Sequence, residues 1–300
     1  MLRAWENARL YVVLLTGVVT VSFAAIFIRL ADAPPLVTAT YRLGLAALIL
    51  APLGLLRRWP ELRGLDRKDL LWALLSGVFL TLHFVFWIAS LEHTTVASSV
   101  VFVATNPMFA GIAAHLFRQD RLSPLGFAGI LLAVLGGMII GWDDVAVGGR
   151  ALWGDFLALL GAAMAAGYFM AGRRLRPKVS LLAYVSIVYS IAALGALLVS
   201  ALTKQTMTGY SSGTYAMFVM LAVGPQIIGH SSLNWALRHL SASAVGVTTL
   251  GEPVGSAILA YFILQEVTTL LKVGGAGLIL AGIYFSLRES GRGRRLALGA

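Results

Sequence analysis

The chain has 300 residues, of which 59% are hydrophobic and only 12% carry a charge. Soluble domains usually carry about 25% charged residues, so this chain has too few to cover the surface of a soluble protein of its length. The composition excludes a soluble enzyme, and it excludes a disordered chain, which needs low hydrophobicity and high charge. The sequence contains no cysteine, which excludes disulfides, thiolate metal ligands and a cysteine nucleophile.

Ten mostly apolar runs are long enough to cross a bilayer, which takes about 20 residues each. In chain order they are Leu10–Ile28, Pro35–Leu56, Leu70–Leu91, Thr95–Phe117, Pro124–Trp142, Leu152–Gly172, Val179–Thr203, Tyr215–Leu237, Ala242–Leu264 and Val267–Leu287. The first run follows two arginines, as the apolar part of a signal peptide does. It has no convincing small-residue cleavage site, so we interpret it as the first membrane helix. The sequence therefore predicts an all-α polytopic membrane protein with ten transmembrane helices.

The net charge of +10 is concentrated at one set of helix ends. If the N-terminus lies inside, eighteen of the 23 basic residues fall at inner ends, four fall at outer ends, and Arg42 lies within a span. This asymmetry is the positive-inside distribution of membrane proteins. It accounts for the basic excess without nucleic acid as a partner. We expect a bacterial inner-membrane protein in the lipid bilayer with both termini cytoplasmic.

The second half of the chain repeats the first at an offset of 146 residues. Residues 91–140 and 237–286 share eleven identities, and the matched residues include prolines, glycines and a glutamine beside an acid. We expect a first five-helix repeat at 1–148, a second at 149–287, and a basic cytoplasmic tail at 288–300. Because five is an odd number, the second repeat enters the membrane from the opposite side. Such inverted repeats are typical of secondary transporters, in which the site lies near the midplane between the halves. A duplication kept only for packing is the structural alternative.

Several short motifs make the chain similar to the drug/metabolite transporter superfamily. They are Tyr41-Arg42, Ala89-Ser90-Leu91 with Ser98, Pro107, Glu252-Pro253, Gln119-Asp120 with Gly129 and Gly136, and Gln265-Glu266 with Gly275 and Gly282. Within it the chain resembles the EamA-type permeases and, among these, most closely the YddG-type amino-acid exporters. The resemblance implies a basket of helices around a central cavity and alternating access. It also implies that the helices bend at Pro107 and Pro253, which we take as hinges.

The eighth predicted span carries the clearest polar pattern. Gln226, His230, Asn234 and Arg238 are spaced four apart, so an α-helix places them on one face. Polar groups at membrane depth are costly unless they face protein or a wet cavity. We expect Gln226, His230 and Asn234 to line a substrate path, with interhelical hydrogen bonds as the structural alternative.

An aromatic face marks the third predicted span. Phe79, His83, Trp87 and Ser90 share this broad face, which suits planar substrates and cations. The pair His83 and Trp87 is the strongest binding candidate there, although ordinary packing explains any single aromatic residue equally well. Family geometry adds Phe102 and Tyr168 as candidates. Asn106, which stands in the first half where the second has Glu252, is a further candidate and could donate to a substrate carboxylate.

Two charged residues have no role in orienting the chain. Glu252 precedes Pro253, which frees a backbone carbonyl and bends the helix. Glu252 has the chemistry to accept a proton, bind a substrate ammonium, or pair with Arg42. The sequence leaves open whether Glu252 is functional or structural, and it favours a structural role for Arg42.

These patterns predict a secondary active transporter that exports amino acids, aromatic or bulky apolar ones among them, or related small metabolites. A multidrug or lipophilic-cation exporter is the alternative, and an intramembrane enzyme using Ser211 and His230 is a remote one. We expect no enzyme activity, no catalytic residue, no cofactor and no metal site. We expect a small-molecule substrate, a monomer, and the proton as a candidate coupling ion. Substrate identity, direction and proton coupling are left open by the sequence.

Overall fold

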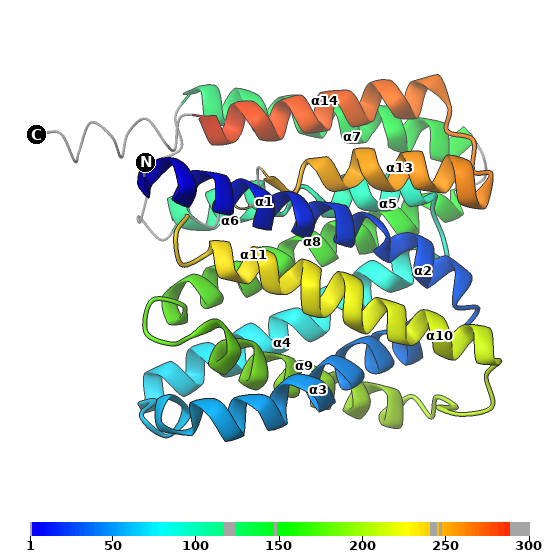
Figure 1. The fold of residues 1–300 in the computed structure, drawn as a ribbon. Coiled ribbons are helices and arrows are strands. Elements are labelled where there is room, and N and C mark those ends of the chain that lie inside the picture. The colour runs from blue at the N-terminus through cyan, green and yellow to red at the C-terminus, as the bar shows by residue number, and fades with distance from the viewer. Residues whose placement is uncertain (1, 117–123, 147–148, 241–244, 246–247, 289–300) are drawn as a thin grey trace, which may run out of the picture.

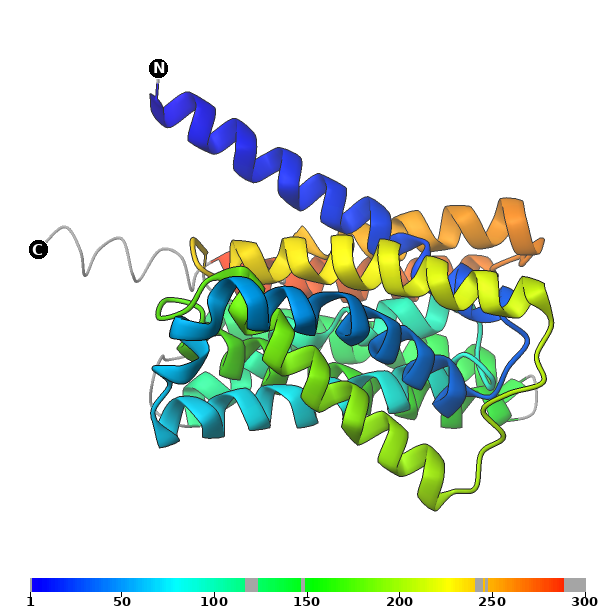
Figure 2. The ribbon, with the colours of Figure 1, turned by 60° about the horizontal axis from the view of Figure 1, so that its bottom comes forward.

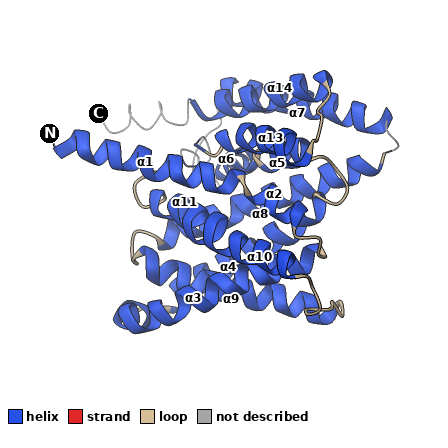
Figure 3. Ribbon diagram, turned by 45° about the vertical axis from the view of Figure 1, so that its right-hand side comes forward, coloured by secondary structure: helices blue, strands red, loops and turns tan. Residues whose placement is uncertain are grey.

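The computed structural model describes residues 2–116, 124–146, 149–240, 245 and 248–288. Every regular element in this part of the chain is a helix (Figure 3). Three sequence-based expectations fall wholly or partly outside it. They concern the loop with Gln119 and Asp120, the beginning of the ninth predicted span, and the basic tail beyond Arg288.

The described helices follow the ten predicted spans. They are α1 (Leu2–Ser22), α2 (Ala24–Leu30), α3 (Pro35–Arg63), α4 (Arg67–Ser90), α5 (Val96–Val103), α6 (Asn106–Leu116), α7 (Pro124–Ala146), α8 (Arg150–Leu175), α9 (Leu181–Leu202), α10 (Ser212–Leu221), the π-helix η1 (Ala222–His230), α11 (Ser231–Ala236), α13 (Gly251–Leu264) and α14 (Leu270–Arg288). Within the described residues, eight continuous or broken helices are long and apolar enough to cross a membrane, and α13 and α14 contribute shorter apolar helices at Gly251–Leu264 and Leu270–Phe285. The all-α, ten-helix architecture is confirmed.

Several of the spans are not single straight α-helices. The first is interrupted at Phe23, and the fourth is interrupted at Ala104 and Thr105, just before Asn106 and Pro107 begin α6. The eighth passes through the π-helix η1, which contains Pro225. Proline lacks the amide hydrogen of a regular helical bond, and π-helical turns are frequent at functional sites. Each irregularity interrupts the regular α-helical hydrogen-bonding pattern within a span.

Helix boundaries recur at the same offset as the sequence repeat. Pro35 and Leu181, which begin α3 and α9, lie 146 residues apart, and so do Pro124 and Leu270, which begin α7 and α14. The same offset separates Ser90 and Ala236, where α4 and α11 end. The repeat is therefore present in the backbone as well as in the residues.

Corresponding helices of the two halves run antiparallel. α7 and α14 lie side by side (Figure 1), and Gly129 and Ala133 lie against Gly282, whereas Gly136 lies against Gly275. An added Cβ on Gly136 would lie 2.5 Å from the carbonyl oxygen of Gly275, so the two backbones are in direct contact. Small residues permit such close approach of membrane helices. Along this contact the residue numbers of α7 rise while those of α14 fall, so the two helices run in opposite directions, as an inverted repeat requires.

The bundle has two edges and a packed middle. Figure 1 shows α7 and α14 along one edge and α3 with α9 along the other. Between them α4 packs against α8 and α9, and α1 packs against η1, α11 and α13. The N-terminal turns of α1 project beyond the bundle (Figure 2). The core among these helices is rich in alanine and large apolar side chains, and its members include Leu43, Leu80, Phe84, Val188 and Tyr184.

Side-chain caps fix where several helices begin. Asp66 accepts from the amide of Asp69 at 2.7 Å, and Thr95, Ser180 and Ser211 each accept from the amide three residues later. Such caps satisfy amides that have no partner in the first helical turn. Outside the spans, the Asp69 amide lowers the pKa of the Asp66 carboxyl below its usual value. The polar residues between the apolar runs thus end the membrane helices and start the next ones.

Candidate substrate pocket

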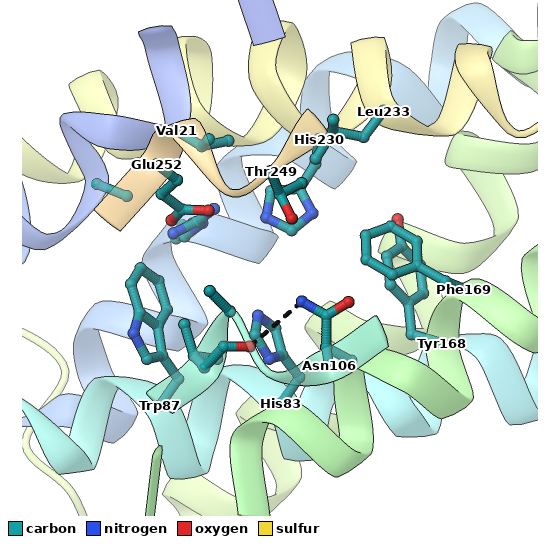
Figure 4. Close-up of a pocket in the computed structure, with 15 residues that line it drawn as sticks. Val21, His83, Trp87, Asn106, Tyr168, Phe169, His230, Leu233, Thr249 and Glu252 are labelled. Atoms are coloured by element: carbon teal, nitrogen blue, oxygen red, sulfur yellow. Dashed lines mark hydrogen bonds between the residues drawn. The ribbon is translucent and has the colours of Figure 1, made fainter. Parts of the chain in front are cut away.

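A pocket lies in the middle of the bundle, where both halves of the chain meet. The empty space in it amounts to about 500 Å³, counting the part that opens outward. Its lining consists of Val21, Ala24, Arg42, His83, Trp87, Val103, Ala104, Asn106, Ala165, Tyr168, Phe169, His230, Leu233, Thr249 and Glu252. Figure 4 shows Glu252, Thr249 and His230 on one side, facing Trp87, His83 and Asn106 on the other.

Equivalent residues of the two repeats line the pocket. Three pairs of lining residues are 146 positions apart: Trp87 and Leu233, Val103 and Thr249, and Asn106 and Glu252. Equivalent positions of the two halves therefore face the same space, as expected for a site at a repeat interface. The members of each pair differ chemically, so the pocket has one aromatic and one acidic side rather than two equal ones.

Two histidines and their aromatic neighbours border the pocket from its opposite sides. His83 Nδ1 lies 2.9 Å from the carbonyl oxygen of Gly161, and its ring stacks parallel to that of Trp87 at 5.9 Å between centroids. The ring centroid of His230 lies 5.3 Å from that of Phe84 and 6.3 Å from that of His83. These contacts hold flat faces around the pocket, which suits aromatic or bulky apolar groups of a bound molecule.

Arg42 borders the pocket from α3 and is fully buried. Its Nε donates to Oε1 of Gln226 at 2.9 Å, and its guanidinium carbon lies 4.1 Å from the centre of the Phe84 ring. Neither Nη1 nor Nη2 has a hydrogen-bond partner in the described part of the chain. Arg42 and Glu252 form no salt bridge. Among the described residues, no ion pair with an N–O distance of 4.0 Å or less includes either of them. The structural pairing that the sequence left open is not made here.

Glu252 occupies the first turn of α13 rather than the interior of a continuous helix. Its side chain is half-buried because it borders the pocket. Asn106, its counterpart in the first half, begins α6 and donates to the carbonyl oxygen of Val103 at 3.2 Å (Figure 4). Each half thus places a polar side chain at the start of a helix in the middle of the bundle.

The polar face predicted for the eighth span is divided between two roles. His230 lines the pocket, whereas Gln226 and Asn234 are fully buried behind the lining. Asn234 donates to the hydroxyl of Tyr168 at 2.5 Å, and Gln226 bonds to Arg42. Arg238 lies beyond α11 and is exposed. The wider turns of η1 change the register that a regular α-helix would give, which is why the four residues do not act as one row.

Other candidates lie outside the lining and make structural contacts. The Phe79 ring packs against Gly167, and the Phe102 ring packs against Gly137. Ser90 Oγ lies 2.6 Å from Ser99 Oγ and ties α4 to α5. Pro107 and Pro253 are buried in the first turns of α6 and α13, next to the pocket residues Asn106 and Glu252.

Further lining residues escaped the sequence reasoning. Phe169, Leu233 and Thr249 line the pocket but carry no distinctive pattern. The repeat offset provides a usable signal for two of them, since Leu233 corresponds to Trp87 and Thr249 corresponds to Val103, one turn before the pair Asn106 and Glu252. The remaining lining residues are small or aliphatic, and only the packing of neighbouring helices reveals them.

Ser211 and His230, the only pair considered for an enzyme, are held far apart. Ser211 caps α10 and accepts from the amide of Thr214 at 3.1 Å. His230 ends η1 further along the same broken helix, roughly 28 Å away at about 1.5 Å per residue. In the described residues no group of three or more histidine or acidic side chains is placed to hold a metal ion.

A polytopic helical protein with a polar pocket between two antiparallel halves has the architecture of a membrane transporter. The chain belongs to the EamA-like transporter family, which matches residues 9–142 and 152–288. The chain is thus a multi-pass membrane protein of a transporter family. The two matched segments coincide with the two runs of five helices.

Relatives agree with this assignment. An uncharacterized transporter of Archaeoglobus fulgidus is 26% identical over 273 residues, which cover 89% of this chain and 94% of that protein. The uncharacterized transporter YdfC of Bacillus subtilis is 23% identical over 231 residues, covering 75% of this chain and 74% of YdfC. A protein of known crystal structure is similar with a TM-score of 0.67 and 18% identity, over 95% of this chain and 98% of that one. At that identity it supports the fold alone.

Proposed function

We propose that this protein is a secondary active transporter of the bacterial inner membrane that exports amino acids, including aromatic or bulky apolar ones, by alternating access. The observation that carries the proposal is the pocket between the halves, which combines the Glu252 carboxylate with the flat faces of His83, Trp87 and Tyr168. An ammonium group fits beside the carboxylate, and an apolar side chain fits against the rings. The similarity to YddG-type exporters supports the same substrate class.

Alternating access follows from the inverted repeat. The pocket lies between two halves of opposite direction, so rocking one half against the other would open it to each side in turn. Pro107 and Pro253 stand at the helix breaks beside Asn106 and Glu252, where a change of bend alters the pocket directly. We propose them as hinges, with the protein acting as a monomer and both termini cytoplasmic.

The test is flux in vesicles that contain the purified protein. Vesicles are loaded with a panel of amino acids, and efflux is measured with and without a pH gradient. Flux of apolar or aromatic amino acids above that of protein-free vesicles is expected. A folded protein that moves none of them would remove the amino-acid proposal.

Export of lipophilic cations is the second candidate, favoured by the single acid of the pocket beside Trp87. Tetraphenylphosphonium flux in wild type and in Glu252→Gln separates the two. A cation exchanger should lose flux and its pH dependence in the variant. An amino-acid transporter should move no tetraphenylphosphonium in either form.

The same variant tests proton coupling. If L-phenylalanine flux responds to the pH gradient in wild type and this response disappears in Glu252→Gln, the result would support the proton as coupling ion and Glu252 as its acceptor.

A further inference from the structure

The guanidinium of Arg42 is the most unusual group in the bundle. It is fully buried, it borders the pocket, and four of its five N–H donors, those on Nη1 and Nη2, have no partner in the described residues. Arginine stays protonated in proteins, so the charge is present. A charged group at membrane depth whose hydrogen-bond donors have no partners is costly and marks functional positions.

Two neighbours fix the direction of this guanidinium. Gln226 accepts from Nε at 2.9 Å and so occupies the donor on that nitrogen. Phe84 lies under its plane at 4.1 Å, a cation–π arrangement that stabilises the charge but accepts no hydrogen bond. The free edge that remains carries both Nη atoms in the fork that binds a carboxylate through two parallel hydrogen bonds.

Arg176 shows what a structural buried arginine looks like in the same protein. It is almost completely buried, yet its Nε donates to the carbonyl oxygen of Asn234 at 2.9 Å and its Nη1 to that of Val179 at 2.6 Å. Backbone acceptors thus hold it at a helix junction, outside the pocket. Among the described residues, Arg42 makes a single hydrogen bond, from Nε to the side chain of Gln226, and none from its two Nη atoms.

We propose that Arg42 is the carboxylate receptor of the pocket, so that the transported molecule is held by its carboxylate at Nη1 and Nη2. This rests on the proposed function in one respect, the transport of amino acids. Glu252 lines the same pocket, and no ion pair with an N–O distance of 4.0 Å or less joins it to Arg42. A zwitterion bridges the two, with its carboxylate at Arg42, its ammonium at Glu252 and its side chain against Trp87 and His83. Arg42 thereby selects against cations that lack an acid group.

Binding by the purified full-length protein in detergent tests this with three matched probes. L-phenylalanine carries both charges, 3-phenylpropanoate carries only the carboxylate, and phenethylamine carries only the ammonium. Arg42→Gln is expected to weaken the two carboxylate probes about tenfold or more, as for loss of charge-assisted hydrogen bonds, and to leave phenethylamine within about threefold. Arg42→Lys, which keeps the charge but not the fork, should fall between wild type and Arg42→Gln.

Two further variants control for folding. Gln226→Glu keeps Arg42 and adds a competing carboxylate beside it, so it should weaken 3-phenylpropanoate even if Arg42→Gln does not fold. Arg176→Lys should leave the preference among the three probes as in wild type. Unchanged binding of 3-phenylpropanoate in Arg42→Gln or Gln226→Glu overturns the inference, and so does equal weakening of all three probes. Carboxylate binding through Arg42 without amino-acid flux in vesicles would instead remove the proposed function and leave this inference standing.

Discussion

Asn234 donates a hydrogen bond of 2.5 Å to the hydroxyl of Tyr168 and a longer one of 3.3 Å to the hydroxyl of Tyr189. This contact joins α11 to α8 directly behind the pocket, where Tyr168 presents its ring. The sequence marked both residues as binding candidates, whereas the structure gives Asn234 the task of orienting Tyr168.

Coupling between these two residues is measurable. Asn234→Ala and Tyr168→Phe should each lower the thermal stability of the detergent-solubilised protein, and the double variant should lose less than the sum. The expected coupling is about 0.5–1.7 kcal/mol, the range found for hydrogen bonds between membrane helices. Tyr41→Phe, combined with Asn234→Ala, provides the control. The Tyr41 hydroxyl donates to the carbonyl oxygen of Met207 elsewhere in the bundle, so the two losses of stability should simply add. Full additivity of Asn234→Ala with Tyr168→Phe would contradict this role.

The contact between α7 and α14 predicts that alanine substitution of two glycines on α14 changes the stability of the protein differently. A Cβ on Gly282 would lie 2.7 Å from the backbone nitrogen of Ala133, whereas a Cβ on Gly277 would have no neighbour within 4 Å. Gly282→Ala should therefore lower stability by about 1–3 kcal/mol, as overpacking does, and Gly277→Ala should leave it unchanged or slightly raised. Melting curves of the two variants, purified side by side, provide the comparison. Equal stability of both would mean that the two helices do not pack as described.

The helix breaks predict that binding and transport can be separated. Pro107→Ala restores an amide hydrogen in the first turn of α6 and favours a continuous helix through Ala104 and Thr105. If the break serves alternation, L-phenylalanine binding should stay within about threefold of wild type while vesicle flux falls about tenfold or more. This follows because straightening the helix disfavours one of the two states without removing a binding group. Flux that remains at the wild-type rate would show that the break is not needed for movement.

The fold was largely predictable because bilayer spans need long apolar runs, and these leave a clear signal in the residues. The helix starts at Pro35, Leu181 and Leu270 lie within three residues of the starts of the predicted runs, and the offset between Pro35 and Leu181 matches the repeat. The pairing of α7 with α14 was not predicted as an interface between the halves, although the glycines that permit it stood out.

The site was only partly predictable. Six candidates from the sequence line the pocket: His83, Trp87, Asn106, Tyr168, His230 and Glu252. Phe79 and Phe102 share their residue type with binding aromatics, but Gly167 and Gly137 on neighbouring helices accept their rings instead. Gln226 and Arg42 are 184 residues apart in the sequence, and their hydrogen bond becomes visible only in the fold. Such assignments depend on tertiary partners and on the π-helical register of η1, and a one-dimensional pattern of period 3.6 carries neither.

The most direct test of the pocket uses the fact that the chain has no cysteine of its own. Ala165→Cys places one thiol in the pocket wall, and Ser212→Cys places one at the exposed start of α10 as the control. Modification by a small methanethiosulfonate reagent is followed with and without L-phenylalanine. L-Phenylalanine should slow modification at position 165 several-fold and leave position 212 unchanged. Equal modification rates at position 165 with and without saturating L-phenylalanine, in a protein that transports it, would show that the substrate binds elsewhere.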